Sequence, residues 1–277
     1  MPAGMILILF FFIPFFESFL LSFQSYRHDI YKPEWVGLGN YIELLNSPVF
    51  WKTILNTFIY LAGVVPILVI LSLIVAIIIN QKLIGITIYR AIIYIPVIIS
   101  IVVAGIAWKW LYASNGIINY LMNLVYLPKI GWLTDPNIAI YSVMAVTVWK
   151  GIGYYMVIYM AALTSIPKDL YEAAEIDGAN EIQKHLTVTI PHLKPTIALV
   201  SIISSISAMK VFVEIYIMTQ GGPMNASKTI VYYIYQRAFE NLDLGYASAA
   251  GVILLVIIMI LSIINMRFFE GKNYVNS

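Results

Sequence analysis

Six long apolar stretches separated by polar segments dominate the pattern of the chain. A helix rises 1.5 Å per residue, so about 20 apolar residues cross the ~30 Å hydrocarbon core of a bilayer. The apolar positions run continuously instead of alternating, which favours helices over barrel strands. We therefore expect membrane-spanning helices at residues 5–23, 54–79, 91–108, 138–163, 196–218 and 246–268.

Proline lies inside several of the expected spans, including Pro14, Pro66 and Pro96. Such prolines are tolerated where neighbouring helices or water satisfy the freed backbone carbonyl, so we expect the spans to pack as a bundle. The first apolar run is too long for the core of a signal peptide, and no small-residue cleavage site follows it. We therefore expect the first span to be retained in an all-α membrane protein.

Composition agrees with a membrane protein and excludes other classes. The 277 residues are 61% hydrophobic and 11% charged, against about 25% charged in soluble domains. An ordinary soluble enzyme, a disordered chain and a fibrous repeat are thereby excluded. The net charge of +2 is too small to indicate a nucleic-acid partner. Cysteine is absent, and the three histidines show no spacing typical of metal ligands.

Charge counts do not decide the orientation. If both termini are cytoplasmic, the inner and outer segments hold equal numbers of Lys and Arg, so the positive-inside rule gives no answer. Because the inner segments are shorter, positive charge is denser in them. This higher density modestly favours the orientation with both termini in the cytoplasm.

The polar segment 165–195 connects the fourth and fifth expected spans. It contains five of the fourteen acidic residues, so we expect it to lie in water. Pro167 and Asp169 can begin a helix, and Gly178 can end it because glycine accepts left-handed backbone.

A second helix is expected directly after this glycine. Asn180 can cap its N-terminus, with Gln183 three residues later as in a capping box. Pro191 and Pro195 are expected to end this helix and to lead into the fifth span. The segment thus predicts a helical hairpin outside the membrane, continuous with two spans.

The spacing within this segment resembles that of a known family. Glu172-Ala173-Ala174 is followed by three residues, Gly178, nine residues, and Val188-Thr189-Ile190-Pro191. This pattern resembles the EAA loop of ABC importer permeases, in which EAA, three residues, G and nine residues precede I-x-L-P. Val188 and Ile190 are conservative departures, and the spacing is unbroken. The alternative is a solvated hairpin that merely caps two spans.

Three further stretches narrow the resemblance. Residues 218–250 are similar to the segment before the last span of sugar-type permeases, and residues 35–41 and 50–57 are similar to the external loop and second-span entry of that group. The similarity thus extends over most of the chain and favours carbohydrate permeases of the maltose and glycerol-phosphate type.

The resemblance implies a six-transmembrane-helix ABC importer permease bundle with a cytoplasmic coupling helix. It divides the chain into a first helix with an external loop (1–53), a permease domain (54–268) containing the EAA loop, and a cytoplasmic tail (269–277). The residues it implies for ATPase coupling are Glu172, Ala173, Ala174, Asp177, Gly178 and Pro191.

The resemblance also implies partners and location. The expected partners are a second permease subunit in a heterodimer, two ATPase subunits, an extracytoplasmic solute-binding protein, a sugar and membrane lipid, with no nucleic acid. The expected location is the bacterial plasma (inner) membrane, with both termini cytoplasmic. ATP and Mg²⁺ are expected to bind the partner subunits, since this chain has no GxxxxGK[ST] sequence to hold ATP phosphates. We expect no cofactor and no catalytic residue in this chain. Transport would proceed by alternating access.

Ionisable and aromatic residues within the spans give candidates for the substrate path. Glu214 and Tyr216 suit a sugar, because a carboxylate accepts hydrogen bonds from hydroxyls and an aromatic ring stacks on apolar sugar faces. Lys210 lies one helical turn before Glu214, so a structural pair within one helix is an alternative for that carboxylate. Weaker candidates on the fourth span are Tyr154, Tyr155 and Tyr159.

The sequence leaves three alternative functions open. The same fold could carry an amino acid or a peptide. An ion-coupled secondary transporter needs no ATPase-docking helix and more often shows broken spans with internal repeats. An intramembrane enzyme is the third alternative, but neither paired catalytic acids nor HExxH occur.

Overall fold

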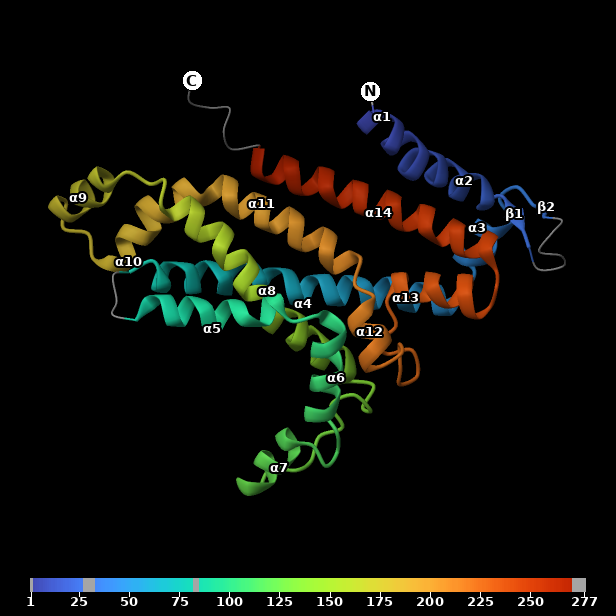
Figure 1. Cartoon of the computed structure of the whole chain (residues 1–277), viewed down its shortest axis with the longest axis horizontal. Helices are drawn as coiled ribbons and strands as arrows, with labels where there is room; N and C mark the ends of the chain where they lie inside the picture. Colours follow the sequence, from blue (N-terminus) through green and yellow to red (C-terminus); the bar gives the residue numbers. More distant parts are fainter. Residues whose placement is uncertain (1, 27–32, 82–84, 271–277) are drawn as a thin grey trace.

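The computed structural model describes residues 2–26, 33–81 and 85–270, and these form a bundle of long helices (Figure 1). Five helices are long and apolar enough to cross a membrane, or six if one bent pair counts as a span. The predicted fold class is thereby confirmed, and the six expected spans correspond to these five helices and the bent pair. The greater part of the expected tail, residues 271–277, lies outside the described residues.

The first span consists of three consecutive helical segments, α1 (Pro2–Leu7), the π-helical η1 (Ile8–Phe12) and α2 (Ile13–Leu21). Pro14 lies in the first turn of α2, where its missing N–H leaves the helix intact. A short antiparallel pair, β1 (Gln24–Ser25) with β2 (Glu34–Trp35), follows. The helix α3 (Gly39–Leu45) then leads into α4 (Pro48–Ile79).

The centre of the bundle is the packing of α4 against α8 (Ala139–Leu163), with α11 (Ile190–Met209) beside both. Ser47 caps the start of α4 by accepting a hydrogen bond from the Phe50 N–H. The fully buried core side chains where these helices meet include Tyr60, Val64, Val143, Val146, Met156, Tyr159 and Val200.

The third span is not one helix, contrary to the sequence-based expectation. The helix α5 (Ile86–Ile98) bends by 97° into α6 (Ile101–Leu111), with Ile99 in an extended conformation between them. Pro96 lacks an N–H and weakens the last turn of α5, which favours a break there. In Figure 1, α6 and α7 (Ile117–Leu124) project away from the bundle.

The fifth span also differs from its expected form at both ends. The helices α10 (Glu181–Lys184), η2 (His185–Thr189) and α11 form one helix over Glu181–Met209, so Pro191 does not end the second helix of the hairpin. The π turn of η2 places Pro191 in the first turn of α11, where its missing N–H is tolerated.

At its other end this helix stops at Met209, nine residues before the expected end of the fifth span at residue 218. The chain resumes as α12 (Val213–Met218) after a break at residues 210–212. Phe212 has φ −139° and ψ −58°, outside the helical region, and this conformation separates the two helices.

The C-terminal helices from α13 onwards pack on the start of α4. The helices α13 (Ile230–Tyr235), η3 (Gln236–Glu240) and α14 (Leu244–Glu270) surround a second core that includes Phe50 and Tyr246. In Figure 1, α14 runs towards the end of the molecule that carries α9 (Lys168–Ile176) and α10.

Candidate functional site

The hairpin formed by α9 and α10 adopts the predicted geometry. Gly178 has φ +81°, and its N–H donates to the Glu175 carbonyl at 3.0 Å, while the Ala179 N–H donates to the Ala174 carbonyl at 2.9 Å. This pair of bonds is a Schellman ending, which needs a residue in left-handed conformation at the position of Gly178. The expectation that Gly178 ends α9 is confirmed.

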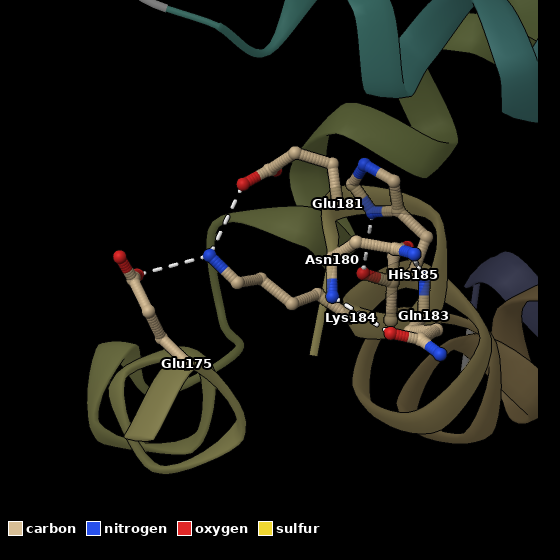
Figure 2. A network of polar contacts seen from close by, with 7 residues as sticks. Glu175, Asn180, Glu181, Gln183, Lys184 and His185 are labelled. Atoms are coloured by element: carbon tan, nitrogen blue, oxygen red, sulfur yellow. Dashed lines mark hydrogen bonds and ion pairs between the residues drawn. The ribbon is translucent and has the colours of Figure 1, made fainter. Parts of the chain in front are cut away.

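The second helix of the hairpin begins with the predicted capping box. The Asn180 side chain accepts from the Gln183 N–H at 2.9 Å, and the Gln183 side chain accepts from the Asn180 N–H at 2.8 Å (Figure 2). Two backbone donors that the first turn cannot satisfy internally are thereby satisfied. The turn between the helices is therefore fixed by local hydrogen bonds.

Lys184 connects the two helices of the hairpin. Its Nζ lies 2.9 Å from a Glu175 carboxylate oxygen of α9 and 3.1 Å from a Glu181 oxygen of α10 (Figure 2). The hydrogen bonds to Glu175 and Glu181 raise the pKa of Lys184 above its ordinary value, so the ammonium stays charged at neutral pH. Its side chain is 11% exposed although both carboxylates face solvent.

Hydrogen bonds also join α9 to the start of the fifth span. The Tyr171 and Thr189 hydroxyl oxygens lie 2.8 Å apart, and Thr189 is fully buried. The same Thr189 oxygen lies 3.0 Å from Nδ1 of His185. Through these contacts α9 is attached to the long helix Glu181–Met209 by side chains as well as by the turn.

The predicted coupling residues form an accessible surface. Glu172, Ala173, Asp177, Gly178 and Pro191 are exposed, and Ala174 is half-buried against the core.

Large apolar side chains beside these residues also face solvent. Ile176 is 86% exposed, and Ile182 and Leu186 are exposed as well. Exposed aliphatic side chains next to carboxylates, outside the span, are typical of a surface that docks another protein.

A cavity of about 480 Å³ lies at the opposite end of α11, next to the break in the fifth span. Its charged lining residues come from two helices and the break between α11 and α12, and they are Lys150, Lys210 and Glu214. Thr147 and Ser207 add hydroxyl groups, and Phe212 adds an aromatic ring. The cavity therefore offers hydrogen-bond donors, acceptors and an apolar face together.

Lys150 has a specific role at the break in the third span. Its Nζ donates to the carbonyls of Pro96, Val97 and Ile99 at 3.0, 3.0 and 2.6 Å. These carbonyls are at the end of α5, where no following helical N–H can satisfy them. The positive ammonium also complements the negative end of the helix dipole. Lys150 thus holds the bent third span against α8.

The structure separates the two residues of the expected intrahelical pair. Lys210 follows the last residue of α11, whereas Glu214 lies in the first turn of α12. The premise of a single helix is therefore wrong, although both side chains line the cavity. Glu214 is attracted electrostatically to Lys150, but the described residues contain no ion pair between these two side chains.

The other substrate-path candidates lie outside the cavity lining. Tyr216 belongs to an aromatic cluster, with its ring stacked on Phe212 at 5.5 Å between centroids and edge-on to Tyr235 at 5.3 Å. Tyr154 is 45% exposed. Tyr155 and Tyr159 are buried in the core.

Side-chain hydrogen bonds join two segments that are distant in the sequence. The Asn56 side chain donates to the Asn225 and Lys228 carbonyls at 2.8 and 2.9 Å, and the Thr57 hydroxyl accepts from the Ile230 N–H at 2.9 Å. These bonds hold the loop between α12 and α13 against α4. Sequence reasoning singled out both stretches but did not place them in contact.

Sequence reasoning also missed Lys150, Thr147 and Ser207 as cavity residues. A signal was present for Lys150, because an isolated lysine near the middle of an apolar span requires a polar partner. Nothing in the sequence identified the partner as the carbonyls of α5.

Comparison with known proteins identifies the family. Residues 36–272 match the model of the family described as "Binding-protein-dependent transport system inner membrane component". The chain is 34% identical over 277 residues to the lactose transport system permease protein LacF of Rhizobium radiobacter, covering 98% of this chain and 92% of LacF. It is 32% identical over 282 residues to the arabinooligosaccharides transport system permease protein AraP of Bacillus subtilis, covering 98% and 88%.

A solved structure shares the fold. It is a bacterial alginate ABC transporter in complex with a periplasmic protein that holds an alginate pentasaccharide. A chain of that complex superposes with a TM-score of 0.83 at 25% identity, covering 98% of this chain and 93% of the other. From the family match and from both relatives, we conclude that the chain belongs to the binding-protein-dependent transport system inner membrane component family, the permease subunits of ABC importers.

Proposed function

We propose that this chain is one of two permease subunits that carry a sugar or oligosaccharide across the inner membrane by alternating access, driven by two separate ATPase subunits. A continuous helix between the hairpin and the cavity supports this proposal above all. Residues Glu181–Met209 form a helix of 29 residues, which is about 43 Å long at 1.5 Å per residue. The hairpin begins this helix, and Ile206 and Ser207 near its end line the cavity.

The mechanism follows from this connection. An ATPase subunit that moves α9 also moves the start of the long helix, because the Lys184–Glu175 pair and the Tyr171–Thr189 hydrogen bond join them. A rigid helix transmits that movement to the cavity wall. The breaks after Ile98 and after Met209 let the helical segments beyond them adopt a second arrangement. ATP and Mg²⁺ are proposed to bind the ATPase subunits, which then bias the two arrangements.

The docking role is proposed for the exposed surface of the hairpin. Glu172, Asp177 and Gly178 face solvent beside the exposed side chain of Ile176. We assign this end of the bundle to the cytoplasm. This assignment places both termini there as well, because α14 runs towards that end and the first span, from α1 to α2, runs away from it (Figure 1). A periplasmic binding protein would then deliver its sugar to the opposite end.

A sugar is the proposed cargo because the cavity pairs hydroxyl, charged and aromatic groups, as sugar recognition requires. The relatives named for lactose and arabinooligosaccharides agree with this choice.

Reconstitution of the complete importer tests the proposal. Sugar uptake should require ATP, the binding protein and both permease subunits. Glu172→Lys should reduce ATPase docking and uptake together, since it reverses a charge on the docking surface. The matched control is Glu34→Lys, an equal charge change in the exposed strand β2. Uptake that needs no ATPase, or wild-type docking in Glu172→Lys, contradicts the proposal.

A further inference from the structure

The helices α6 and α7 form an arm, residues 101–124, that leaves the bundle beside the cavity. The 97° bend after α5 turns α6 out of the direction of the third span, and α7 continues the arm away from the other helices (Figure 1). Ile101, the first residue of α6, lines the cavity, so the arm begins at the cavity wall. A partner that docks on the arm would therefore also lie close to the cavity.

Each helix of the arm exposes one apolar stripe. In both helices the exposed apolar side chains follow one another at intervals of three, one and three residues, which places them on a single helix face. The two stripes consist of Val103, Ile106, Ala107 and Trp110 in α6, and of Ile117, Tyr120, Leu121 and Leu124 in α7. Apart from the alanine, these side chains are 43–76% exposed. Contiguous apolar surface of this kind is typical of a face that another apolar surface covers.

The arm is held in place through its other faces. Gly105 packs on α12, where a Cβ added to it would lie 3.1 Å from Ile217. In α7 the fully buried Asn119 donates to the carbonyls of Ala113 and Ile130 and accepts from the Ile130 N–H. The polar side chain of α7 thus faces its own chain, while the apolar stripe faces outwards. The stripes are therefore preorganised for binding.

The surroundings of the stripes are unsuited to hydrocarbon. The cavity beside them is open at one side, where Ser207 and Lys210 are exposed. An ammonium within a span is costly in contact with lipid chains, so this side meets protein or water. The start of α7 after Gly116 also lacks a side-chain cap, and hydrocarbon cannot satisfy the N–H groups of a first turn. Because the stripes themselves are apolar, protein is favoured over water.

We propose that the stripes of α6 and α7 dock on an apolar helix face of the second permease subunit, which thereby closes the open side of the cavity. This inference rests on the proposed function and names the surface through which the two permeases meet. Trp110 and Tyr120 are the expected anchors, because large aromatic side chains contribute most to binding at protein interfaces.

A single thiol can report what lies against the arm, because the chain contains no cysteine. In the complete importer in lipid nanodiscs, with its partner subunits freed of cysteine, Leu121→Cys is labelled with benzophenone maleimide and irradiated. The label should crosslink to the second permease subunit, which mass spectrometry identifies.

Ile42→Cys is the matched control for this crosslink. Ile42 is 59% exposed, against 55% for Leu121, and it lies on α3, away from the arm (Figure 1). It should give at most about a tenth of the crosslink to the second permease, since a photoprobe reacts only with groups that it contacts.

Brominated lipids test the membrane as the alternative neighbour. A bimane label on the Leu121→Cys thiol should lose less than about a tenth of its fluorescence when the nanodisc lipid is brominated, because a packed interface excludes lipid. Strong quenching without a crosslink places the stripe in the membrane interface and overturns the inference.

A polar substitution tests how much the stripe contributes to association. Leu121→Gln should lower the amount of second permease that purifies with this chain about tenfold, because it buries an amide in an apolar interface. Leu121→Met keeps the apolar contact and should retain the partner, as should Ile42→Gln.

The other outcomes separate this inference from the proposed function. A crosslink from Leu121→Cys to the binding protein alone, no crosslink at all, or unchanged retention of the partner in Leu121→Gln overturns the inference. If uptake still requires both permeases in that case, the proposed function stands. Uptake without a second permease contradicts the proposed function itself.

Discussion

Substitution of Gly178 tests whether the hairpin needs glycine for its left-handed backbone conformation or for contact with the ATPase subunit. The residue has φ +81°, and apart from its two chain neighbours no atom of the described residues lies within 4 Å of a Cβ added there. Any effect of a side chain on the isolated turn is therefore conformational strain and not steric overlap. An L-residue in the left-handed region is disfavoured by roughly 1–2 kcal/mol, and a β-branched residue by more.

These magnitudes predict an order of effects. Gly178→Ala should raise the open fraction of the hairpin about 5- to 30-fold, since 1–2 kcal/mol corresponds to that range. Gly178→Val should have a larger effect. Gly178→Asn should be nearly neutral, because asparagine tolerates left-handed backbone.

Hydrogen exchange of amides in the hairpin of the assembled importer measures the open fraction, and binding of the ATPase subunit measures the consequence. The Ala179 amide, which donates to Ala174, is the reporter closest to the strain. If Asn and Val weaken ATPase binding equally while exchange is unchanged, the glycine is required for contact with the partner, and the strain argument is refuted.

Two further predictions concern the packing of the third and fourth spans. Lys150→Met should destabilise the importer by about 1–3 kcal/mol, because three carbonyls of α5 lose their donor, whereas Lys150→Arg should retain most of the stability in thermal unfolding. Gly153→Ala should cost about 1–3 kcal/mol in the same assay, because the new Cβ would lie 2.5 Å from the Ile93 carbonyl oxygen, and a stable Gly153→Ala protein would show that α5 can move away. Gly251→Ala is its control, and it should be neutral or slightly stabilising, since a Cβ there meets nothing within 4 Å in the part of the chain that the structure describes.

Local chemistry in the sequence was sufficient to predict the class of protein and the structure of the hairpin. Continuous apolar runs of about 20 residues are long enough to cross the hydrocarbon core of a bilayer. Such a segment must be helical there, since every backbone polar group in lipid needs a partner within the segment. The helix ending at Gly178 and the capping box at Asn180 depend on residues at most five positions apart. Such short-range hydrogen bonds follow from residue type and spacing alone.

The tertiary structure decided where the spanning helices break and which groups contact the broken ends. The sequence places Pro96 inside an expected single span, whereas the structure has a 97° bend there that is held by Lys150, some fifty residues away on α8. Pro191 indicated a helix end, yet the π turn before it let the helix continue. Both outcomes depend on how the backbone rearranges around a proline, and a periodic pattern does not contain that information.

The cavity likewise exists only in three dimensions. Lys150, Lys210 and Glu214 come from α8 and from the two sides of a broken span, and the sequence suggested one helix for the last two. Asn56 and the loop that it holds are separated by 169 residues or more. The sequence determined which residues are chemically unusual, because charge in an apolar span is evident from composition. Their neighbours were decided by folding, because the packing of distant helices determines which groups line the same cavity.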